Sequence, residues 1–260
     1  MNHRYLIAAA ALVCASATHA QTPEEKGLAI ATEAEQRDEG YGSTESTMTM
    51  VLRNRNGDEA VRTLRSRTLE VADDGDKSLV VFDEPRDVAG TALLTHAHTE
   101  GDDDRWLYLP ALRRVKRIAS SGQSGSFMGS EFAYEDLGGQ EIAKYDFTWL
   151  RDETVEGTDM HVLQRIPKDQ NSGYSKQVVW LDQAELLLRK VTFYDRKGEL
   201  LKTLTAGEYQ QFLDRHWRPR QLDMVNHITG KSTTLRFADY AFDVGLSDRD
   251  FDENSLANVR

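Results

Sequence analysis

The sequence predicts a mainly β (α+β) fold, with one large, curved antiparallel sheet, or incomplete β-barrel, and a helical lid. From Ser43 onward, runs with apolar–polar alternation of period two recur at a spacing of roughly 8–12 residues, with turn residues between them. One segment near the N-terminus has helical spacing instead. Strands do not alternate with helices, as they would in a nucleotide-binding sheet. This pattern favours a single antiparallel domain.

Residues 1–20 have the features of a secretory signal peptide. Arg4 gives a basic start, residues 6–17 form an apolar core, and small residues precede the cleavage expected after Ala20. The apolar run is shorter than the roughly 20 residues that a membrane-spanning helix needs. We therefore expect export of residues 21–260 to the periplasm as a single domain.

Composition limits the chemistry of the exported chain. Cys14 is the only cysteine and would leave with the signal, so disulfides and thiol catalysis are excluded. Val13 is not the small residue that a lipoprotein signal would place before Cys14. The signal holds one Arg and no acid, so its removal changes the net charge from −11 to −12. An acidic chain argues against nucleic acid as a partner.

The one expected helix begins at the start of the mature chain. Thr22 can cap it, Pro23 suits its first position, and Glu25 completes a capping box. Gly40 is a suitable end. Apolar residues recur at helical spacing, at Leu28, Ala31 and Ala34. This stripe predicts that the helix packs on another element.

Strands are expected through the rest of the chain. Met48, Met50 and Leu52 alternate with polar residues, and Asn56-Gly57 marks a hairpin turn before a second alternating run. Further strands are expected within residues 77–85, 90–98, 105–112, 147–155, 159–167, 176–182, 186–195, 199–214, 215–227 and 232–243. The concave face of such a sheet must be covered. Only the helix and residues 122–139 are available as a lid, which predicts a cavity for an apolar ligand.

The Gly/Ser stretch at residues 120–130 does not match a catalytic or phosphate-binding loop. No Lys follows its glycines, as a phosphate-binding G-x-x-x-x-G-K-[ST] loop requires. The G-x-S-x-G pattern of a hydrolase is one residue short around Ser124. A mobile loop is the better interpretation, and we expect neither catalysis nor a cofactor.

Two further groups allow two interpretations each. His96 and His98, with Asp102–Asp104 nearby, are either metal ligands or a strand end that leads into a solvated acidic turn, and the second is favoured. The basic cluster is formed by Arg113, Arg114, Lys116 and Arg117. It is either a charged strand edge that prevents unwanted pairing or a docking patch for an acidic partner or an anionic headgroup.

The central stretch RWLYLPALRRVKRIASSGQSGSFMGSEFAYEDL, residues 105–137, resembles the signature region of the LolA-like family of outer-membrane lipoprotein-sorting proteins. The segments FDEPRDVAGTALLTH and RHWRPRQLDMVNHITGKSTTLRFADY are also similar to that family. The resemblance implies a LolA/LolB-type incomplete barrel around a hydrophobic cavity. It also implies periplasmic residence and operation beside an RND (MMPL-type) inner-membrane exporter.

We therefore expect a non-enzymatic, monomeric periplasmic carrier that binds a lipid or lipoprotein acyl chain without metal or cofactor. The alternative is an accessory subunit that docks on the exporter and carries no cargo. Expected lipid-binding residues are Met48, Met50, Leu52, Trp106, Tyr108, Phe127, Met128 and Phe132. The last three would form a flexible gate with Gly125 and Gly129 as hinges, and the basic cluster would meet the exporter or a headgroup.

Overall fold

The computed structural model describes residues 20–139 and 141–259. The predicted signal peptide therefore lies outside the described residues, apart from Ala20. The described chain begins with helix α1 (Pro23–Asp38). Its strands are β1 (Ser43–Arg53), β2 (Glu59–Leu69), β3 (Lys77–Glu84), β4 (Ala92–His96), β5 (Asp104–Leu109), β6 (Arg114–Ile118), β7 (Tyr145–Val155), β8 (Thr158–Pro167), β9 (Tyr174–Asp182), β10 (Leu188–Asp195), β11 (Leu200–Gly207), β12 (Gln210–Phe212), β13 (His216–Arg218), β14 (Gln221–Asn226) and β15 (Ser232–Phe242). Short 3-10 helices are η1 (Pro110–Leu112), η2 (Ser120–Gly122), η3 (Tyr134–Asp136), η4 (Ile142–Lys144), η5 (Asp248–Phe251) and η6 (Glu253–Asn258).

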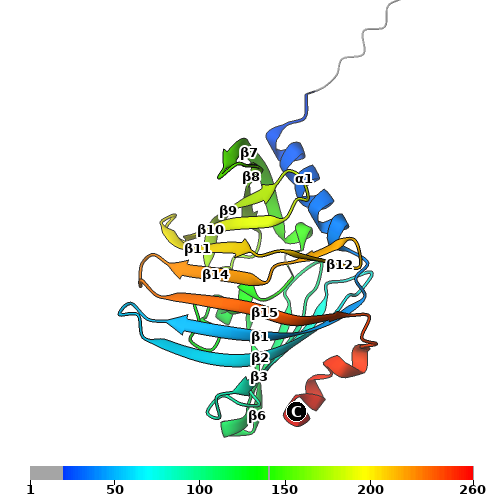
Figure 1. The fold of residues 1–260 in the computed structure, drawn as a ribbon, viewed down its shortest axis with the longest axis vertical. Helices are drawn as coiled ribbons and strands as arrows, with labels where there is room; N and C mark the ends of the chain where they lie inside the picture. Colours follow the sequence, from blue (N-terminus) through cyan, green and yellow to red (C-terminus); the bar gives the residue numbers. More distant parts are fainter. Residues whose placement is uncertain (1–19, 140, 260) are drawn as a thin grey trace, which may run out of the picture.

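Thirteen strands form one antiparallel sheet that curves but does not close (Figure 1). Their order is β6-β5-β4-β3-β2-β1-β15-β14-β11-β10-β9-β8-β7, so β6 and β7 are the two edges. Strands β12 and β13 pair only with each other and form a separate hairpin. The mainly β, incompletely closed fold predicted from the sequence is confirmed. In residues 20–139 and 141–259, no helix combines the length and apolar character needed to cross a bilayer.

Helix α1 begins where the capping residues predict its start. Thr22 Oγ1 accepts from the Glu25 N–H at 3.2 Å, and the Glu25 carboxylate accepts from the Thr22 N–H at 2.9 Å. The predicted apolar stripe is partly wrong, because Leu28 is 47% exposed. The buried side of α1 is instead formed by Gly27, Ile30 and Ala31, which face the sheet's edge at β7.

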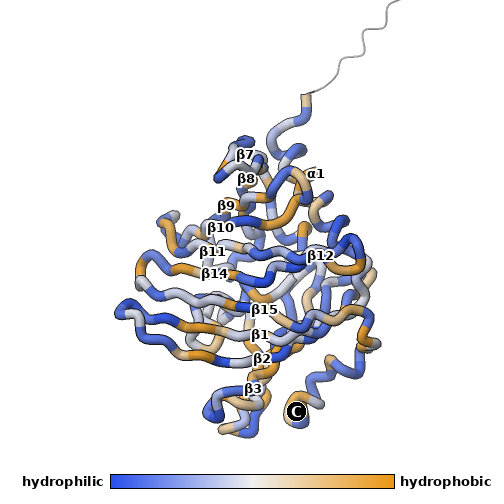
Figure 2. The backbone as a smooth tube through the Cα atoms, in the orientation of Figure 1, coloured by the Kyte–Doolittle hydropathy of each residue, from blue (hydrophilic) through white to orange (hydrophobic). Residues whose placement is uncertain are grey.

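Strand pairing fixes which residues share the concave face. Met48 pairs with Leu64, and Leu64 pairs with Phe82, so all three lie on one side of neighbouring strands. They belong to the main apolar cluster, together with Phe193 of the opposite half of the sheet. Because side chains alternate along a strand, the residues between them lie on the convex face. Apolar and polar positions are accordingly interspersed along the strands (Figure 2).

The convex face of β3–β5 is also apolar and has its own cover. Leu79, Leu94 and Ala92 form a second cluster with Phe251 and Leu256 of the C-terminal 3-10 helices, which the sequence did not predict. Strand β5 therefore packs on both faces, with Leu107 in the main cluster and Trp106 and Tyr108 in the second one.

The expected placement of Trp106 and Tyr108 on the concave face is wrong. Trp106 pairs with Leu94, which pairs with Leu79, and this register puts both aromatics in the convex cluster. Leu107, between them, faces the main cluster instead. An apolar run with no polar alternation does not reveal which of its faces is concave.

Candidate functional site

The concave face encloses a cavity of about 1060 Å³. Its inner wall is apolar and comes from both halves of the sheet, with Met48, Met50, Leu64, Val80, Val191, Phe193, Leu204, Leu222, Leu235 and Phe237. The volume is slightly above the roughly 300–1,000 Å³ of small-molecule pockets, and the apolar lining suits a long hydrocarbon ligand.

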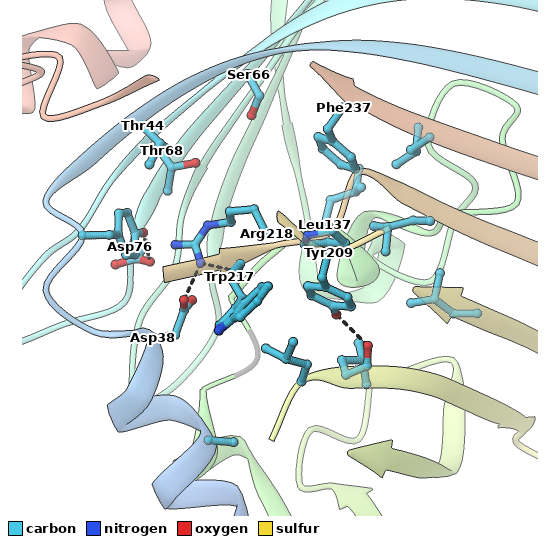
Figure 3. Close-up of a pocket in the computed structure, with 18 of the residues that line it drawn as sticks. Asp38, Thr44, Ser66, Thr68, Asp76, Leu137, Tyr209, Trp217, Arg218 and Phe237 are labelled. Atoms are coloured by element: carbon cyan, nitrogen blue, oxygen red, sulfur yellow. Dashed lines mark hydrogen bonds and ion pairs between the residues drawn. The ribbon is translucent and has the colours of Figure 1, made fainter. Parts of the chain in front are cut away.

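The mouth of the cavity is polar and lies between the C-terminal end of α1 and the β12–β13 hairpin (Figure 3). Arg218 on β13 forms an ion pair with Asp38 at the end of α1. Arg215 donates to the Glu39 carbonyl at 2.9 Å. These two contacts hold the hairpin against the helix. The lid thus consists of α1 and the β12–β13 hairpin, whose residues are predicted from the sequence to belong to the large sheet.

Three more polar groups lie around the mouth. Tyr41 donates to Asp76 Oδ2 at 2.5 Å, and burial raises the pKa of the Asp76 carboxyl. Tyr209 donates to the Leu188 carbonyl at 2.6 Å. Trp217 also lines the cavity, and its buried indole N–H has no hydrogen-bond partner among the described residues. The mouth therefore joins an apolar interior to hydrogen-bonding groups.

The loop between β6 and β7 folds into the concave face and forms part of the cavity wall. Phe127 and Phe132 are 1% and 2% exposed and line the cavity. The Phe127 ring lies 5.6 Å from that of Phe82 on β3. Arg62 on β2 donates to the Met128 carbonyl at 2.6 Å. The large apolar content of this loop is explained by its packing against the sheet.

Buried polar contacts fix the same loop to the opposite half of the sheet. Lys202 Nζ lies 2.5 Å from Asp136 Oδ2, and both side chains are 5% exposed. Asp136 also accepts from the Tyr174 hydroxyl at 2.7 Å. Of the two glycines predicted as hinges, Gly129 has a positive φ of +77° and Gly125 does not. These contacts fasten the loop to the sheet as part of the cavity wall, and its opening as a hinged gate stays a prediction.

The structure brings together part of the predicted lipid-binding set. Met48, Met50, Phe127 and Phe132 line the cavity. Leu52 and Met128 pack against the same apolar cluster without lining the cavity. Tyr209, Trp217 and the lining residues of β10–β15 were not predicted from the sequence. The alternation of these residues is visible in the sequence, but the sequence does not show which of them face the cavity.

The predicted basic cluster forms the outer edge of the sheet. Arg114, Lys116 and Arg117 are exposed on edge strand β6, and Arg113 precedes them with φ +50°. Arg117 pairs with Asp104 on the neighbouring strand. Charged residues on an edge strand prevent sheet extension, and their exposure also leaves them open to a partner.

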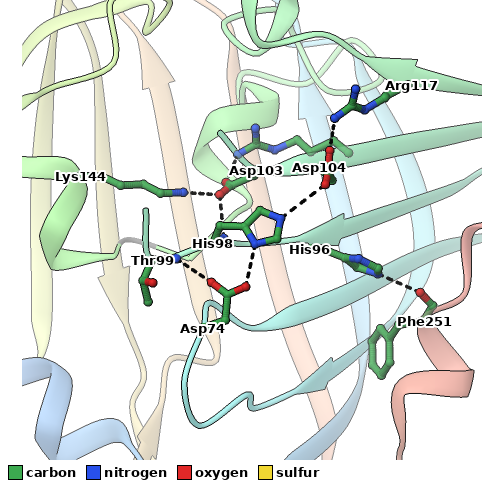
Figure 4. A network of polar contacts seen from close by, with 10 residues as sticks. Asp74, His96, His98, Thr99, Asp103, Asp104, Arg117, Lys144 and Phe251 are labelled. Carbon is green, nitrogen blue, oxygen red and sulfur yellow. Dashed lines mark hydrogen bonds and ion pairs between the residues drawn. The ribbon is translucent and has the colours of Figure 1, made fainter. Parts of the chain in front are cut away.

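The two histidines have separate partners (Figure 4). His96 Nε2 lies 2.8 Å from the Phe251 carbonyl, at the C-terminal 3-10 helices. His98 lies beyond β4, with Nδ1 2.7 Å from Asp74 and Nε2 3.4 Å from Asp104. No group of three or more His, Cys, Asp or Glu suited to a metal occurs in residues 20–139 and 141–259.

His98 predicts a pH dependence of stability. The hydrogen bond that His98 donates to the Asp74 carboxylate raises the pKa of His98 above its ordinary value of 6.5. Its contribution to folding is therefore complete below pH 6.5 and is lost as the pH rises through the higher folded-state pKa. Relative to His98→Gln, the native chain should gain most stability near pH 6 and least near pH 9, measured as the free energy of unfolding in urea. An equal difference at both pH values would contradict this role.

Comparison with solved structures identifies the family. A protein from Vibrio parahaemolyticus described as an outer membrane lipoprotein-sorting protein domain is 57% identical, with a TM-score of 0.89, and the match covers 90% of this chain and 99% of that one. The chain belongs to the LolA-like family of outer-membrane lipoprotein-sorting proteins. The resemblance noted in the sequence is thus confirmed.

Two further solved structures are similar to this LolA-like chain. A DUF1329 family protein from Desulfovibrio piger is 32% identical, with a TM-score of 0.85 and coverage of 90% and 99%. A LolA superfamily protein from Nitrosomonas europaea is 22% identical, covers 88% and 98%, and with a TM-score of 0.70 shares the fold. A family model described as "Uncharacterized protein" matches residues 74–258. The comparison with curated proteins gave no match.

Proposed function

We propose that this LolA-like protein is a periplasmic carrier, acting as a monomer, that binds the acyl chain of a lipid or lipoprotein for transfer between membranes. The observation that supports the proposal most strongly is the cavity of about 1060 Å³ with its apolar wall under a helix-and-hairpin lid. The lipoprotein-sorting description of the 57% identical Vibrio protein supports the same class of cargo.

Burial of an acyl chain provides the driving force. Each buried CH₂ contributes about 0.8 kcal/mol, so a sixteen-carbon chain gains on the order of 12 kcal/mol by leaving water. The same chain is equally stable in a bilayer, so extraction from the membrane requires help. We propose that an RND-type exporter provides it and that the exposed basic cluster on β6 is the docking patch.

Blocking the cavity should weaken cargo binding strongly without unfolding the protein. Ser66 on β2 and Leu222 on β14 both line the cavity and are half-buried. We expect Ser66→Trp with Leu222→Trp to weaken binding of a fluorescent fatty acid by roughly tenfold or more, because each indole fills space that the chain needs. Fluorescence titration measures the affinity, and circular dichroism checks the fold.

Thr63→Trp is the matched control, because residue 63 lies on the same strand but on the opposite face from Leu64 and Ser66. It should leave the affinity unchanged. Unaltered binding in the folded double variant would refute the cavity as the binding site. Absence of binding in the native protein would favour the cargo-free docking subunit.

A further inference from the structure

One transverse row of the concave face differs from its apolar surroundings. Arg165 on β8 pairs with Gln177 on β9, which pairs with Phe193 on β10. Phe193 pairs in turn with Lys202 on β11, and Lys202 with Asn226 on β14. Because directly paired residues lie on the same face of a sheet, this row places two cations and two amides along the inner wall.

At the β11–β14 end of the row, the polar side chains bind the loop between β6 and β7. Lys202 binds Asp136 and also donates to the Glu131 carbonyl at 3.1 Å. Asn226 Nδ2 donates to Glu131 Oε2 at 2.7 Å. The two carboxylates that the loop contributes here are therefore already engaged by this end of the row.

Arg165, at the other end, has no such partner. Its Nε donates to Gln177 Oε1 at 2.6 Å, and its guanidinium lies 4.9 Å from the centre of the Tyr145 ring. Within the described part of the chain, no carboxylate lies within ion-pair distance of it, and its two terminal nitrogens donate no hydrogen bond. Arg165 is half-buried and lines the cavity. Burial lowers the pKa of this guanidinium, as expected for a cation removed from water.

The acidic side chains of the loop between β6 and β7 form no ion pair with Arg165, although the charge of Asp136 favours its protonated form. Asp136 is bound by Lys202, by the Tyr174 hydroxyl and by the Ala133 N–H at 2.6 Å. Glu135 points to the other side, where it accepts from the Ser172 hydroxyl at 2.7 Å and from the Gly173 N–H at 2.9 Å. A guanidinium held in a partly buried wall is costly without an anion, and its planar pair of donors fits a carboxylate or phosphate.

We propose that the cargo is an anionic amphiphile whose carboxylate or phosphate group binds Arg165, while its acyl chain lies along the apolar wall. This inference rests on the proposed carrier function and narrows its cargo to acidic lipids. The two sources of the anion, a free fatty acid and a phosphate-bearing lipid, present the same oxygens to the guanidinium and are distinguished by experiment.

The test measures the affinity of the folded protein for two matched ligand pairs at about pH 8. Palmitate is compared with methyl palmitate, and monopalmitoyl lysophosphatidic acid with monopalmitoylglycerol, by displacement of a fluorescent probe. Native protein should prefer at least one acid over its neutral partner by roughly tenfold, the size of one charge-assisted contact. Arg165→Met should lose that preference, and Arg165→Lys should keep part of it.

Arg151→Gln is the control, because Arg151 lies exposed on β7, where it pairs with Glu153, and does not line the cavity. It should keep the preference. The acid that native protein prefers identifies the source of the anion. Equal affinity for acids and neutral partners in native protein would overturn this inference and leave the carrier intact. Failure to bind any of the four ligands would overturn both. The comparison of acids with neutral partners on native protein tests the preference for an anion even if Arg165→Met does not fold.

Discussion

Replacing Asp136 by alanine is expected to lower the free energy of unfolding by about 3–5 kcal/mol, the cost of removing one partner of a buried ion pair. Lys202 would be left buried in the wall with its charge unpaired. The Tyr174 hydroxyl and the Ala133 N–H would lose their acceptor as well. Urea unfolding of the variant and the native protein measures the difference.

A double variant separates the ion pair from general damage to the loop. Adding Lys202→Met to Asp136→Ala should restore part of the lost stability, because no buried charge is then left alone. Glu59→Ala is the control, since its pair with Arg53 is exposed and should cost no more than about 1 kcal/mol. If Asp136→Ala cost as little as Glu59→Ala, the loop could not be held to the sheet by this pair.

Replacing Gly27 by alanine is expected to destabilise the protein by about 1–3 kcal/mol, as overpacking does. A Cβ at Gly27 would lie 2.6 Å from the Trp149 backbone nitrogen of β7, and backbone cannot move aside as a side chain can. Helix α1 would have to lift from β7. Because the end of α1 lines the cavity mouth, the lid contact between Arg218 and Asp38 should weaken too.

The informative result is whether Gly27→Ala lowers or raises the free energy of unfolding. In an exposed helix position alanine is more favourable than glycine by about 1 kcal/mol. Ala29 is exposed on the same helix, so Ala29→Gly measures that ordinary preference. Thermal or urea unfolding of both variants is sufficient. Stabilisation by Gly27→Ala would show that α1 does not pack against β7 as closely as described.

The fold was predictable because alternation is a local property of the sequence. The hairpin turn at Asn56-Gly57 joins β1 to β2 as expected, with Arg53 opposite Glu59. The capping residues Thr22 and Glu25 fixed the start of α1. In each case, residues a few positions apart determine the structure that they form.

The site was less predictable because it depends on register and on distant contacts. Trp106 and Leu107 are equally apolar, and only their pairing across β4 and β3 separates the convex from the concave face. Lys202 forms its ion pair with Asp136, which lies 66 residues away in the sequence. Arg165 indicates an anion site only because Asp136 is already bound by Lys202. Neither relation leaves a local signal in the sequence.

The most direct test of the carrier is native mass spectrometry of the protein purified from the periplasm, followed by solvent extraction. We expect additional mass that is removed by extraction and identified as an acyl lipid. The variant with Ser66→Trp and Leu222→Trp should carry much less of it. A native protein with the mass of the bare chain, unchanged after incubation with membrane lipids, would contradict the proposed carrier function.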